Sequence, residues 1–361
     1  MELGTDGFYS GITANFFEKA MSKNGGIITK QDLSNYQPVE RDALTGTYKG
    51  YDIIGMPPAS SGGIVLMEIL NIIEYFDISN MGRFSPSFIR TFIEASKYSY
   101  ADRAAHLGDS DFYPVPIHAL ISKEYALPKS KIIQKGIIIP SDKVLSGDKV
   151  QLDSIEKAII EDISETTHYS VIDRWGNAVS VTTTLNSYFG AKVVVEGAGF
   201  LLNNEMDDFS AKAGSPNQFG LVHGEANEIE PGKRMLSSMT PTIVEKDGKV
   251  VLITGSPGGS RIISTTAQVI LNYIDFKMDP EEAVTAPRIH HQWKPDILYY
   301  ENDALTPELI DKLTLMGYEL EEKNRMGSAQ TIGRKHNSGI LVPAPDRRRG
   351  GYGAVVEFNT N

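Results

Sequence analysis

The bond between Glu165 and Thr166 is the first place in the sequence where the residue types suggest chemistry. A stretch without sustained periodicity ends there, and the alternating pattern of a β-strand begins. β-Branched threonines suit the start of a strand, and these residues alone favour that structural interpretation. The functional interpretation is that this bond is cut, which would leave Thr166 with a free α-amino group.

A threonine at a chain end can act as nucleophile and base in one residue. Its α-amino group has an unperturbed pKa of about 7.7–8.0, so near neutral pH it can accept the proton of the residue's own hydroxyl. The hydroxyl can then attack a carbonyl carbon without a histidine or aspartate partner. This chemistry suits a sequence that offers no convincing Ser-His-Asp set.

Further polar side chains follow on the expected return strand of a hairpin. Residues 168–173 and 178–185 have strand patterns and are separated by a turn signal. Pairing across the turn predicts that Thr184 lies beside Thr166, where its hydroxyl can hold the terminal amine. Asn186, on the same face, is a candidate for substrate binding. An ordinary threonine-rich strand is the alternative.

The sequence also has an acidic cluster and a pair of serines. Glu205, Asp207 and Asp208 lie within one short segment, usually a sign of a solvated loop; the spacing of a calcium-binding loop is absent. The functional alternative is recognition of an ammonium group. Ser237 and Ser238 are either turn formers or hydroxyl donors to a carboxylate. Together these residues would complement the zwitterionic end of an α-amino acid.

A glycine-rich segment, residues 255–261, stands between a strand pattern and a helix pattern. It lacks the spacing and the lysine of a phosphate-binding loop, and it lacks the G-x-S-x-G pattern of a nucleophile elbow. The backbone N–H groups of Gly258 and Gly259 can instead stabilise the oxyanion of a tetrahedral intermediate. The missing side chains would let a substrate carbonyl approach.

The elements that must position these residues follow from the apolar patterns. Helices are expected at 11–24, 64–76, 86–105, 261–276 and from 280 to 284, with a capping box at Thr29 and Asp32. Strands are expected at 44–56, 340–342 and 352–358, with a hairpin at 242–254. Residues 127–165 have no sustained period and are expected to form a flexible connector. Strand blocks flanked by helices predict a layered α/β or α+β domain.

Composition excludes several classes of protein. The 361 residues have 41% hydrophobic and 22% charged side chains, as in a globular protein. A formal net charge of −11 argues against nucleic acid as a partner. The absence of cysteine excludes disulfides, zinc-thiolate sites and cysteine nucleophiles. No apolar run approaches the about 18 residues of a membrane span, and the first residues do not have the pattern of a signal peptide.

The histidines and the arginine triplet receive structural interpretations. His168, His223 and the His290-His291 pair have no spacing typical of metal ligands. Arg347-Arg348-Arg349 is expected to be a solvated turn before the last strand. Neither a metal nor a cofactor is expected.

In combination, the order of the motifs is highly specific. The second half contains, in succession, Thr-Thr-His-Tyr-Ser-Val (166–171), Thr-Leu-Asn (184–186), Leu-Asn-Asn-Glu-Met-Asp-Asp-Phe (202–209), Lys-Arg-Met-Leu-Ser-Ser-Met-Thr-Pro-Thr (233–242) and Gly-Ser-Pro-Gly-Gly (255–259). The first half contains Met-Pro-Pro-Ala-Ser-Ser-Gly-Gly (56–63), Glu-Ala (94–95), Tyr-Ala-Asp-Arg (100–103) and Leu-Gly-Asp (107–109). Nearly the whole chain resembles the γ-glutamyltransferases (γ-glutamyltranspeptidases), members of the N-terminal nucleophile hydrolase superfamily.

The resemblance implies an α+β fold, a four-layer αββα sandwich, and an autoprocessed enzyme precursor. Cleavage between Glu165 and Thr166 would give pieces of 165 and 196 residues (361 − 165 = 196). Residues 1–165, with 127–165 as connector, would be the C-terminal part of the large subunit, and 166–361 the small catalytic subunit. The two would stay associated as a heterodimer and form one domain.

The resemblance also implies the role of each site residue. Thr166 would attack the γ-carbonyl of glutathione or a similar γ-glutamyl amide, and water or an amino acid or peptide acceptor would resolve the γ-glutamyl ester. Thr184 would position the amine of Thr166, and the Gly258 and Gly259 amides would form the oxyanion hole. The remaining roles concern the glutamyl group: Asn186, Glu205 and Asp208 would hold its α-amino group, and Ser237 and Ser238 its α-carboxylate. A periplasmic or secreted location is implied by the resemblance alone.

Two departures from the family pattern bear on activity. The family's large subunit begins with a long stretch, including an arginine that clamps the substrate carboxylate, to which no part of this sequence corresponds. Phe219 stands at a lid position that is tyrosine in several relatives; it cannot hydrogen-bond to Asn186, so the lid should close less firmly. The alternatives are a cephalosporin or glutaryl acylase of the same superfamily, and a truncated, non-catalytic homologue that serves as a binding or structural domain.

Overall fold

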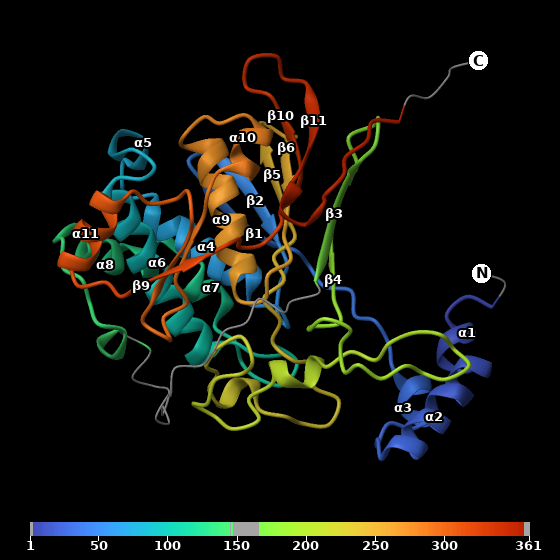
Figure 1. Ribbon diagram of the computed structural model, residues 1–361. Coiled ribbons are helices and arrows are strands. Elements are labelled where there is room, and N and C mark those ends of the chain that lie inside the picture. Colours follow the sequence, from blue (N-terminus) through green and yellow to red (C-terminus); the bar gives the residue numbers. More distant parts are fainter. Residues whose placement is uncertain (1–2, 145, 147–165, 357–361) are drawn as a thin grey trace, which may run out of the picture.

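The largest sheet of the protein is assembled from both halves of the chain. The computed structural model describes residues 3–144, 146 and 166–356 (Figure 1). Six antiparallel strands follow the order β1-β2-β5-β6-β10-β11. They are β1 (Leu44–Tyr48), β2 (Tyr51–Gly55), β5 (Thr242–Lys246), β6 (Lys249–Thr254), β10 (Gln330–Arg334) and β11 (Leu341–Pro345). Because β2 pairs with β5, residues on both sides of Thr166 share one sheet.

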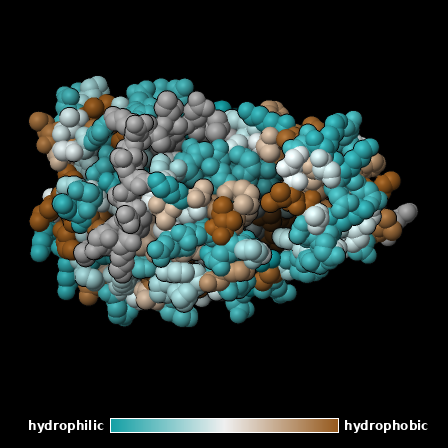
Figure 2. All heavy atoms as spheres, turned by 90° about the horizontal axis from the view of Figure 1, so that it is seen from below, coloured by the Kyte–Doolittle hydropathy of each residue, from teal (hydrophilic) through white to brown (hydrophobic). Residues whose placement is uncertain are grey.

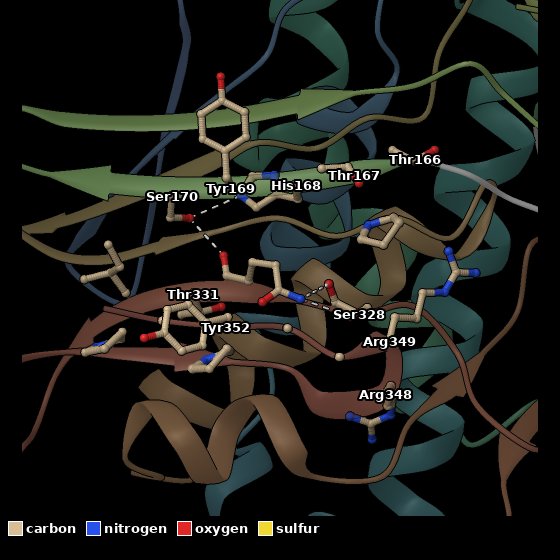
Figure 3. A pocket seen from close by; sticks show the side chains of 18 of the residues that line it. Thr166, Thr167, His168, Tyr169, Ser170, Ser328, Thr331, Arg348, Arg349 and Tyr352 are labelled. Carbon is tan, nitrogen blue, oxygen red and sulfur yellow. Dashed lines mark hydrogen bonds between the residues drawn. The ribbon is translucent and has the colours of Figure 1, made fainter. Parts of the chain in front are cut away.

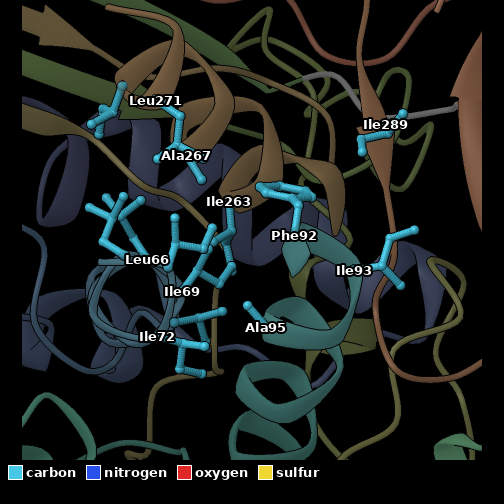
Figure 4. Packing of buried hydrophobic residues seen from close by; sticks show 14 of the residues in the cluster. Leu66, Ile69, Ile72, Phe92, Ile93, Ala95, Ile263, Ala267, Leu271 and Ile289 are labelled. Carbon is cyan, nitrogen blue, oxygen red and sulfur yellow. The ribbon is translucent and has the colours of Figure 1, made fainter. Parts of the chain in front are cut away.

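Helices cover one face of this sheet (Figure 1). The main ones are α4 (Gly62–Ile73), α6 (Pro86–His106) and α9 (Arg261–Ile274). Every residue of α4 and α9 is buried, as expected of helices enclosed by other elements. Figure 4 shows Ile69 of α4, Phe92 of α6 and Ile263 of α9 facing one another in the main core. The predicted helices 64–76, 86–105 and 261–276 are therefore confirmed, within a few residues at their ends.

The predicted hairpin after Thr166 is also confirmed and lies against the other side of the sheet. It consists of β3 (Thr167–Ile172) and β4 (Ala178–Thr183), with His168 opposite Thr182. It contacts β5, β6 and β10, and Ser170 and Ser180 donate to backbone oxygens of Gln330 and Thr254 at 2.9 and 3.2 Å. Of the predicted αββα order, the described residues supply one helical layer and both β layers.

Smaller elements complete the described chain. A separate three-stranded sheet contains β7 (Ile289–His290), β8 (Leu298–Glu301) and β9 (Leu320–Lys323), and α11 (Pro307–Leu315) connects its last two strands. The N-terminal helices α1 (Asp6–Tyr9), α2 (Ile12–Asn24) and α3 (Lys30–Asn35) form a separate small core with Val195. The other helices are α5 (Ile78–Met81), α7 (Ile117–Leu120), α8 (Lys123–Gln134) and α10 (Pro280–Thr285), with 3-10 turns η1 (Ser141–Lys143), η3 (Glu205–Asp208), η4 (Glu225–Asn227) and η5 (Arg347–Arg349).

The long connection between β4 and β5 lies at the lower end of the molecule in Figure 1. Figure 2 shows this end: its surface is mostly hydrophilic, and apolar side chains gather around a hollow. None of the helices within the described ranges is both long and apolar enough to cross a membrane.

Three sequence predictions need correction. The connector predicted for 127–165 is wrong at its start, because α8 continues to Gln134 and packs through buried Lys129 and Ile133; residues 145 and 147–165 lie outside the described residues. A lysine in this segment suggests an exposed connector, but Lys129 is buried because it pairs with Asp102 and Glu68. The strand predicted at 352–358 is wrong for 352–356, which have no strand geometry, and 357–358 are not described.

The third correction concerns the arginine triplet. Arg347–Arg349 form η5, and Arg348 is not solvated: it pairs with Glu301 at 2.8 Å and with Asp346 at 3.2 Å. A run of like charges predicts a surface turn only when no buried carboxylate lies nearby, and the sequence does not show that Asp346 and Glu301 converge there.

Candidate active site

Thr166 directly precedes β3, and its side chain is buried. The hairpin register, which pairs Thr167 with Thr183, places Thr184 opposite it. The Thr166 hydroxyl donates to Oγ1 of Thr184 at 3.1 Å, and the same oxygen accepts from the Asn186 N–H at 2.7 Å. The contact between the two threonines that the hairpin predicted is therefore present.

A small cavity of about 20 Å³ brings together most of the sequence-predicted residues. Its walls include Thr166, Thr184, Asn186, Glu205, Asp208, Ser237, Ser238 and Gly259. Gly258 is the neighbour of Gly259 in the chain, and Glu165 lies outside the described residues. Segments far apart in the sequence thus meet at the Thr166 hydroxyl.

Carboxylates form one end of this cavity. Glu205 and Asp208 lie on η3, and Glu205 Oε1 is closed off from solvent with no hydrogen-bond partner among the described residues. Burial raises the pKa of Glu205 to about 7. Burial, and then the charge of Glu205, raises the pKa of Asp208 to about 8. Two such groups would be stabilised as anions by a bound cation.

Hydroxyl groups form the other end, and the cation of Arg103 lies buried behind them. Ser237 Oγ lies 2.9 Å from Ser60 Oγ, and Ser238 Oγ accepts from Nη2 of Arg103 at 3.3 Å. Arg103 is 1% exposed and also donates to Ser61 Oγ at 2.9 Å. Burial lowers its pKa only to about 10, so it remains protonated at neutral pH.

Sequence reasoning missed the position of Arg103, although the Tyr-Ala-Asp-Arg segment was recognised as a motif. Arg103 lies in the last turn of α6, where basic side chains are common, so its position alone did not indicate a buried role. It places a positive charge behind the serine pair, close enough to Asp208 for the two groups to interact electrostatically.

Asn227 links the two ends. Its fully buried amide donates to the backbone oxygen of Asp208 at 2.6 Å and accepts from the N–H of Leu236 at 3.0 Å. Leu236 precedes Ser237, so one side chain ties the acidic segment to the serine pair. Its distance from both in the sequence gave no indication of this role.

The two glycines predicted to form an oxyanion hole have positive φ angles, which favour glycine. Gly258 has φ 137° and Gly259 has φ 55°. A Cβ atom on Gly259 would lie 2.7 Å from the ring of Phe219. No hydrogen bond from either glycine N–H to another described residue is found. The ring of Phe219 therefore packs directly against the segment whose N–H groups remain available to a ligand.

A much larger cavity, about 810 Å³, opens on the other side of Thr166 (Figure 3). It lies between β3 and the C-terminal strands, and its walls include His168, Ser328 and Arg349. His168 bonds with Thr182 Oγ1 at 2.8 Å, and burial lowers its pKa to about 4, so it is neutral at pH 7. This supports its structural interpretation.

The other histidines also have structural surroundings. His223 is buried and lies 3.1 Å from the Asn227 amide, and His290 lies 2.7 Å from Ser264 Oγ. Within the ranges that the structure describes, no group of three or more histidine and carboxylate side chains is placed to hold a metal ion.

Comparison with known proteins gives a match to one protein family. The sequence model of the family "Gamma-glutamyltranspeptidase" matches residues 1–356. The chain is 48% identical over 331 residues to the glutathione hydrolase proenzyme of Escherichia coli, covering 92% of this chain but 55% of that protein. The chain thus spans little more than half the length of this relative.

Solved structures agree with the sandwich fold. A cephalosporin acylase from Bacillus halodurans matches 98% of this chain and 60% of its own with a TM-score of 0.79 at 25% identity. A γ-glutamyltranspeptidase chain from Pseudomonas nitroreducens is 54% identical and matches 53% of this chain, with a TM-score of 0.50. The fold is the α+β sandwich of the N-terminal nucleophile hydrolases.

Proposed function

The chain belongs to the γ-glutamyltranspeptidase family, and from that membership we propose that it cuts itself before Thr166 and then acts as a γ-glutamyl transferase and hydrolase. The donors are γ-glutamyl amides such as glutathione. The observation that carries the proposal is the small cavity, in which the Thr166 hydroxyl, two carboxylates and a serine pair meet.

The charges of the cavity suit a γ-glutamyl group. Glu205 and Asp208 would bind its α-ammonium group, with Asn186 beside them, and binding a cation removes the cost of ionising two close carboxylates. Ser237 and Ser238 would donate to the α-carboxylate, with Arg103 behind them. The γ-carbonyl would then lie at Thr166.

The reaction follows from the freed amine. The α-amino group of Thr166 takes the proton of its hydroxyl, and Oγ1 attacks the γ-carbonyl carbon. Thr184 orients the threonine, while the N–H groups of Gly258 and Gly259 stabilise the oxyanion. The C–N bond breaks, the proton goes to the departing amine, and a γ-glutamyl-threonine ester remains. Water or an amine then takes the γ-glutamyl group and returns a proton to Thr166.

Binding requires the cavity to open. About 20 Å³ is enough for roughly one water molecule, and Phe219 covers Gly259. We therefore expect Phe219 and its segment to move when a donor enters. The cleaved pieces should stay together, because β2 pairs with β5 and α4 packs on α9.

Self-cleavage is the direct test. The purified chain should yield two fragments by mass spectrometry and release nitroaniline from γ-glutamyl-p-nitroanilide. Thr166→Ala should stay intact and inactive, whereas Thr167→Ala, at the exposed neighbouring position, is the matched control. A wild-type chain that remains intact after long incubation would favour the non-catalytic homologue.

An acylase is the second candidate, favoured by the structural likeness to cephalosporin acylase. Substrates distinguish the two. A γ-glutamyl anilide bears an α-ammonium group and a glutaryl anilide does not. The proposed transferase should therefore prefer the γ-glutamyl anilide, and an acylase should not.

A further inference from the structure

Arg103 is a buried cation whose side-chain hydrogen-bond partners are neutral. Within the part of the chain that the structure describes, these partners are Ser61, His223 and Ser238. The buried Arg288, by contrast, pairs directly with the carboxylate of Asp346 at 2.6 Å. A buried charge surrounded by neutral groups keeps much of its desolvation cost. An anionic ligand in the small cavity would therefore stabilise Arg103.

Arg103 fixes the direction of the Ser238 proton. Its Nη2 donates to Ser238 Oγ at 3.3 Å. A serine hydroxyl has one proton and two lone pairs, and a guanidinium has no acceptor, so the proton of Ser238 points away from Arg103. A cation that donates to a hydroxyl also makes that hydroxyl a stronger donor. Because Ser238 forms part of the wall of the small cavity, its hydroxyl is prepared to donate to a ligand there.

The neighbouring Ser237 is less constrained. Its Oγ lies 2.9 Å from Ser60 Oγ, and either hydroxyl can be the donor. The proton of Ser237 can therefore point to Ser60 or into the cavity. Of the two serines, Ser238 is the one whose donor role the structure fixes.

Arg103 is itself held in place by residues from both halves of the chain. Its Nε donates to Ser61 Oγ at 2.9 Å, and Ser61 Oγ donates to the backbone oxygen of Ser237 at 2.8 Å. Nη1 lies 3.4 Å from His223 Nδ1. Since the guanidinium can only donate, this ring nitrogen is the acceptor. These contacts keep the guanidinium directed at Ser238.

We infer that Arg103 is a positioning residue that makes the small cavity selective for donors with a free α-carboxylate. It acts through Ser238, and it is not itself part of the cavity wall. This inference rests on the proposed function. A carboxylate accepts the proton of Ser238 and supplies the negative charge that the surroundings of Arg103 lack. An α-carboxamide can accept the proton but brings no charge.

The test compares two donors, γ-glutamyl-p-nitroanilide and its α-carboxamide. The measured quantity is the ratio of their kcat/KM values, in which the fraction of folded protein cancels. The wild-type chain should prefer the acid. Arg103→Gln should lower this acid-to-amide ratio by about tenfold, the lower end for a hydrogen bond to a charged group, because the charge acts through Ser238. Arg103→Lys keeps the charge and should retain more of the ratio.

A second variant keeps the charge but loosens its support. Ser61→Ala removes the partner of Arg103 Nε, and it should lower the ratio by about threefold, the effect of one ordinary hydrogen bond. It serves if Arg103→Gln does not fold. The matched control is Arg90→Gln, which removes the same charge from the same helix, where Nη1 donates to the backbone oxygen of Ile133 at 3.0 Å. It should keep the ratio.

A double variant tests the route through Ser238. In the Ser238→Ala background the contact with Arg103 is already lost, so adding Arg103→Gln should change the ratio little. A further full tenfold fall would show that the charge does not act through this hydroxyl, and would overturn the inference.

Three other outcomes would also overturn it. The first is a wild-type chain that does not prefer the acid, and the second is an equal fall in Arg90→Gln. The third is an unchanged ratio in every Arg103 and Ser61 variant that folds; an equal rise in KM for both donors would then show that Arg103 acts on Asp208, whose pKa its charge lowers. In each of these outcomes the wild-type chain still turns over a donor, so the proposed function stands. A wild-type chain that releases nitroaniline from neither donor would contradict the proposed function and this inference with it.

Discussion

Two groups of buried charges in this molecule have opposite arrangements. Near the C-terminus, Arg288 pairs with Asp346 at 2.6 Å and Arg348 pairs with Glu301 at 2.8 Å. Backbone N–H groups also donate hydrogen bonds to these carboxylates: Ala329 donates to Asp346 and Met326 donates to Glu301. In the small cavity, Glu205 and Asp208 have raised pKa values, and one oxygen of Glu205 has no partner among the described residues.

This difference in pairing separates a structural role from a role in binding. A buried carboxylate that is paired with an arginine and accepts from backbone N–H groups holds elements together, here η5 and the sheet of β7, β8 and β9. A buried carboxylate without a cation destabilises the folded chain, and a ligand that brings the cation recovers that free energy. We call the paired charges near the C-terminus the complete group, and Glu205 with Asp208 in the small cavity the incomplete group. The incomplete group is the better candidate for a binding site, even though the complete group has more charges.

Removing one partner from the complete group should have the largest effect. Asp346→Ala leaves Arg288 buried without its partner, which should lower the free energy of unfolding by about 3–5 kcal/mol. Urea denaturation measures this. Asp311→Ala, at an exposed position on α11, should change stability by less than about 0.5 kcal/mol. Equal loss in both variants would remove the distinction between the two groups.

Changing the incomplete group should affect binding rather than folding. Asp208→Asn should raise KM for γ-glutamyl-p-nitroanilide by about 10- to 100-fold, since a hydrogen bond to a charged group contributes about 1.5–3 kcal/mol. Asp207→Asn is the matched control, because Asp207 accepts from the Gln218 N–H at 3.1 Å and is not part of the cavity wall. An equal rise in KM in both variants would contradict the assignment of Asp208.

A third effect should be on the pH dependence of stability. The folded chain holds protons on Glu205 and Asp208 more tightly than the unfolded chain, because their pKa values are raised to about 7 and about 8. Their contribution is fully present below the unfolded pKa values near 4 and is lost as pH rises through 7 and 8. Between pH 6 and 9 the wild type should therefore lose more stability than a Glu205→Gln, Asp208→Asn double variant. Parallel pH profiles would show that the two carboxylates are not strained.

Sequence patterns predicted local features well. The hairpin after Thr166 depends on period-two alternation around a turn, and it alone is enough to bring Thr184 to Thr166. The capping box of Thr29 and Asp32 is present for the same reason: both partners lie within one turn of chain. The helix Pro86–His106 begins with a proline, and the serine before it, Ser85, is its N-cap.

Patterns failed where the deciding contact was remote. Lys129 looks like a solvated charge until α8 packs it against α4 and α6. Arg348 looks like part of a basic turn until Glu301 and Asp346 reach it. Arg103 contacts Ser238, more than a hundred residues further along the chain. Asn227 contacts Asp208, about twenty residues earlier.

The sequence by itself determined the chemical types at the site, the threonine at a strand start, and the family, because these depend on residue identity and order. Tertiary structure alone decided which groups meet at Thr166: the carboxylates at one end of the small cavity, and the serines with Arg103 behind them at the other. The physical reason is that burial and pairing set whether a charge is neutralised or left for a ligand, and both depend on segments that only folding brings together.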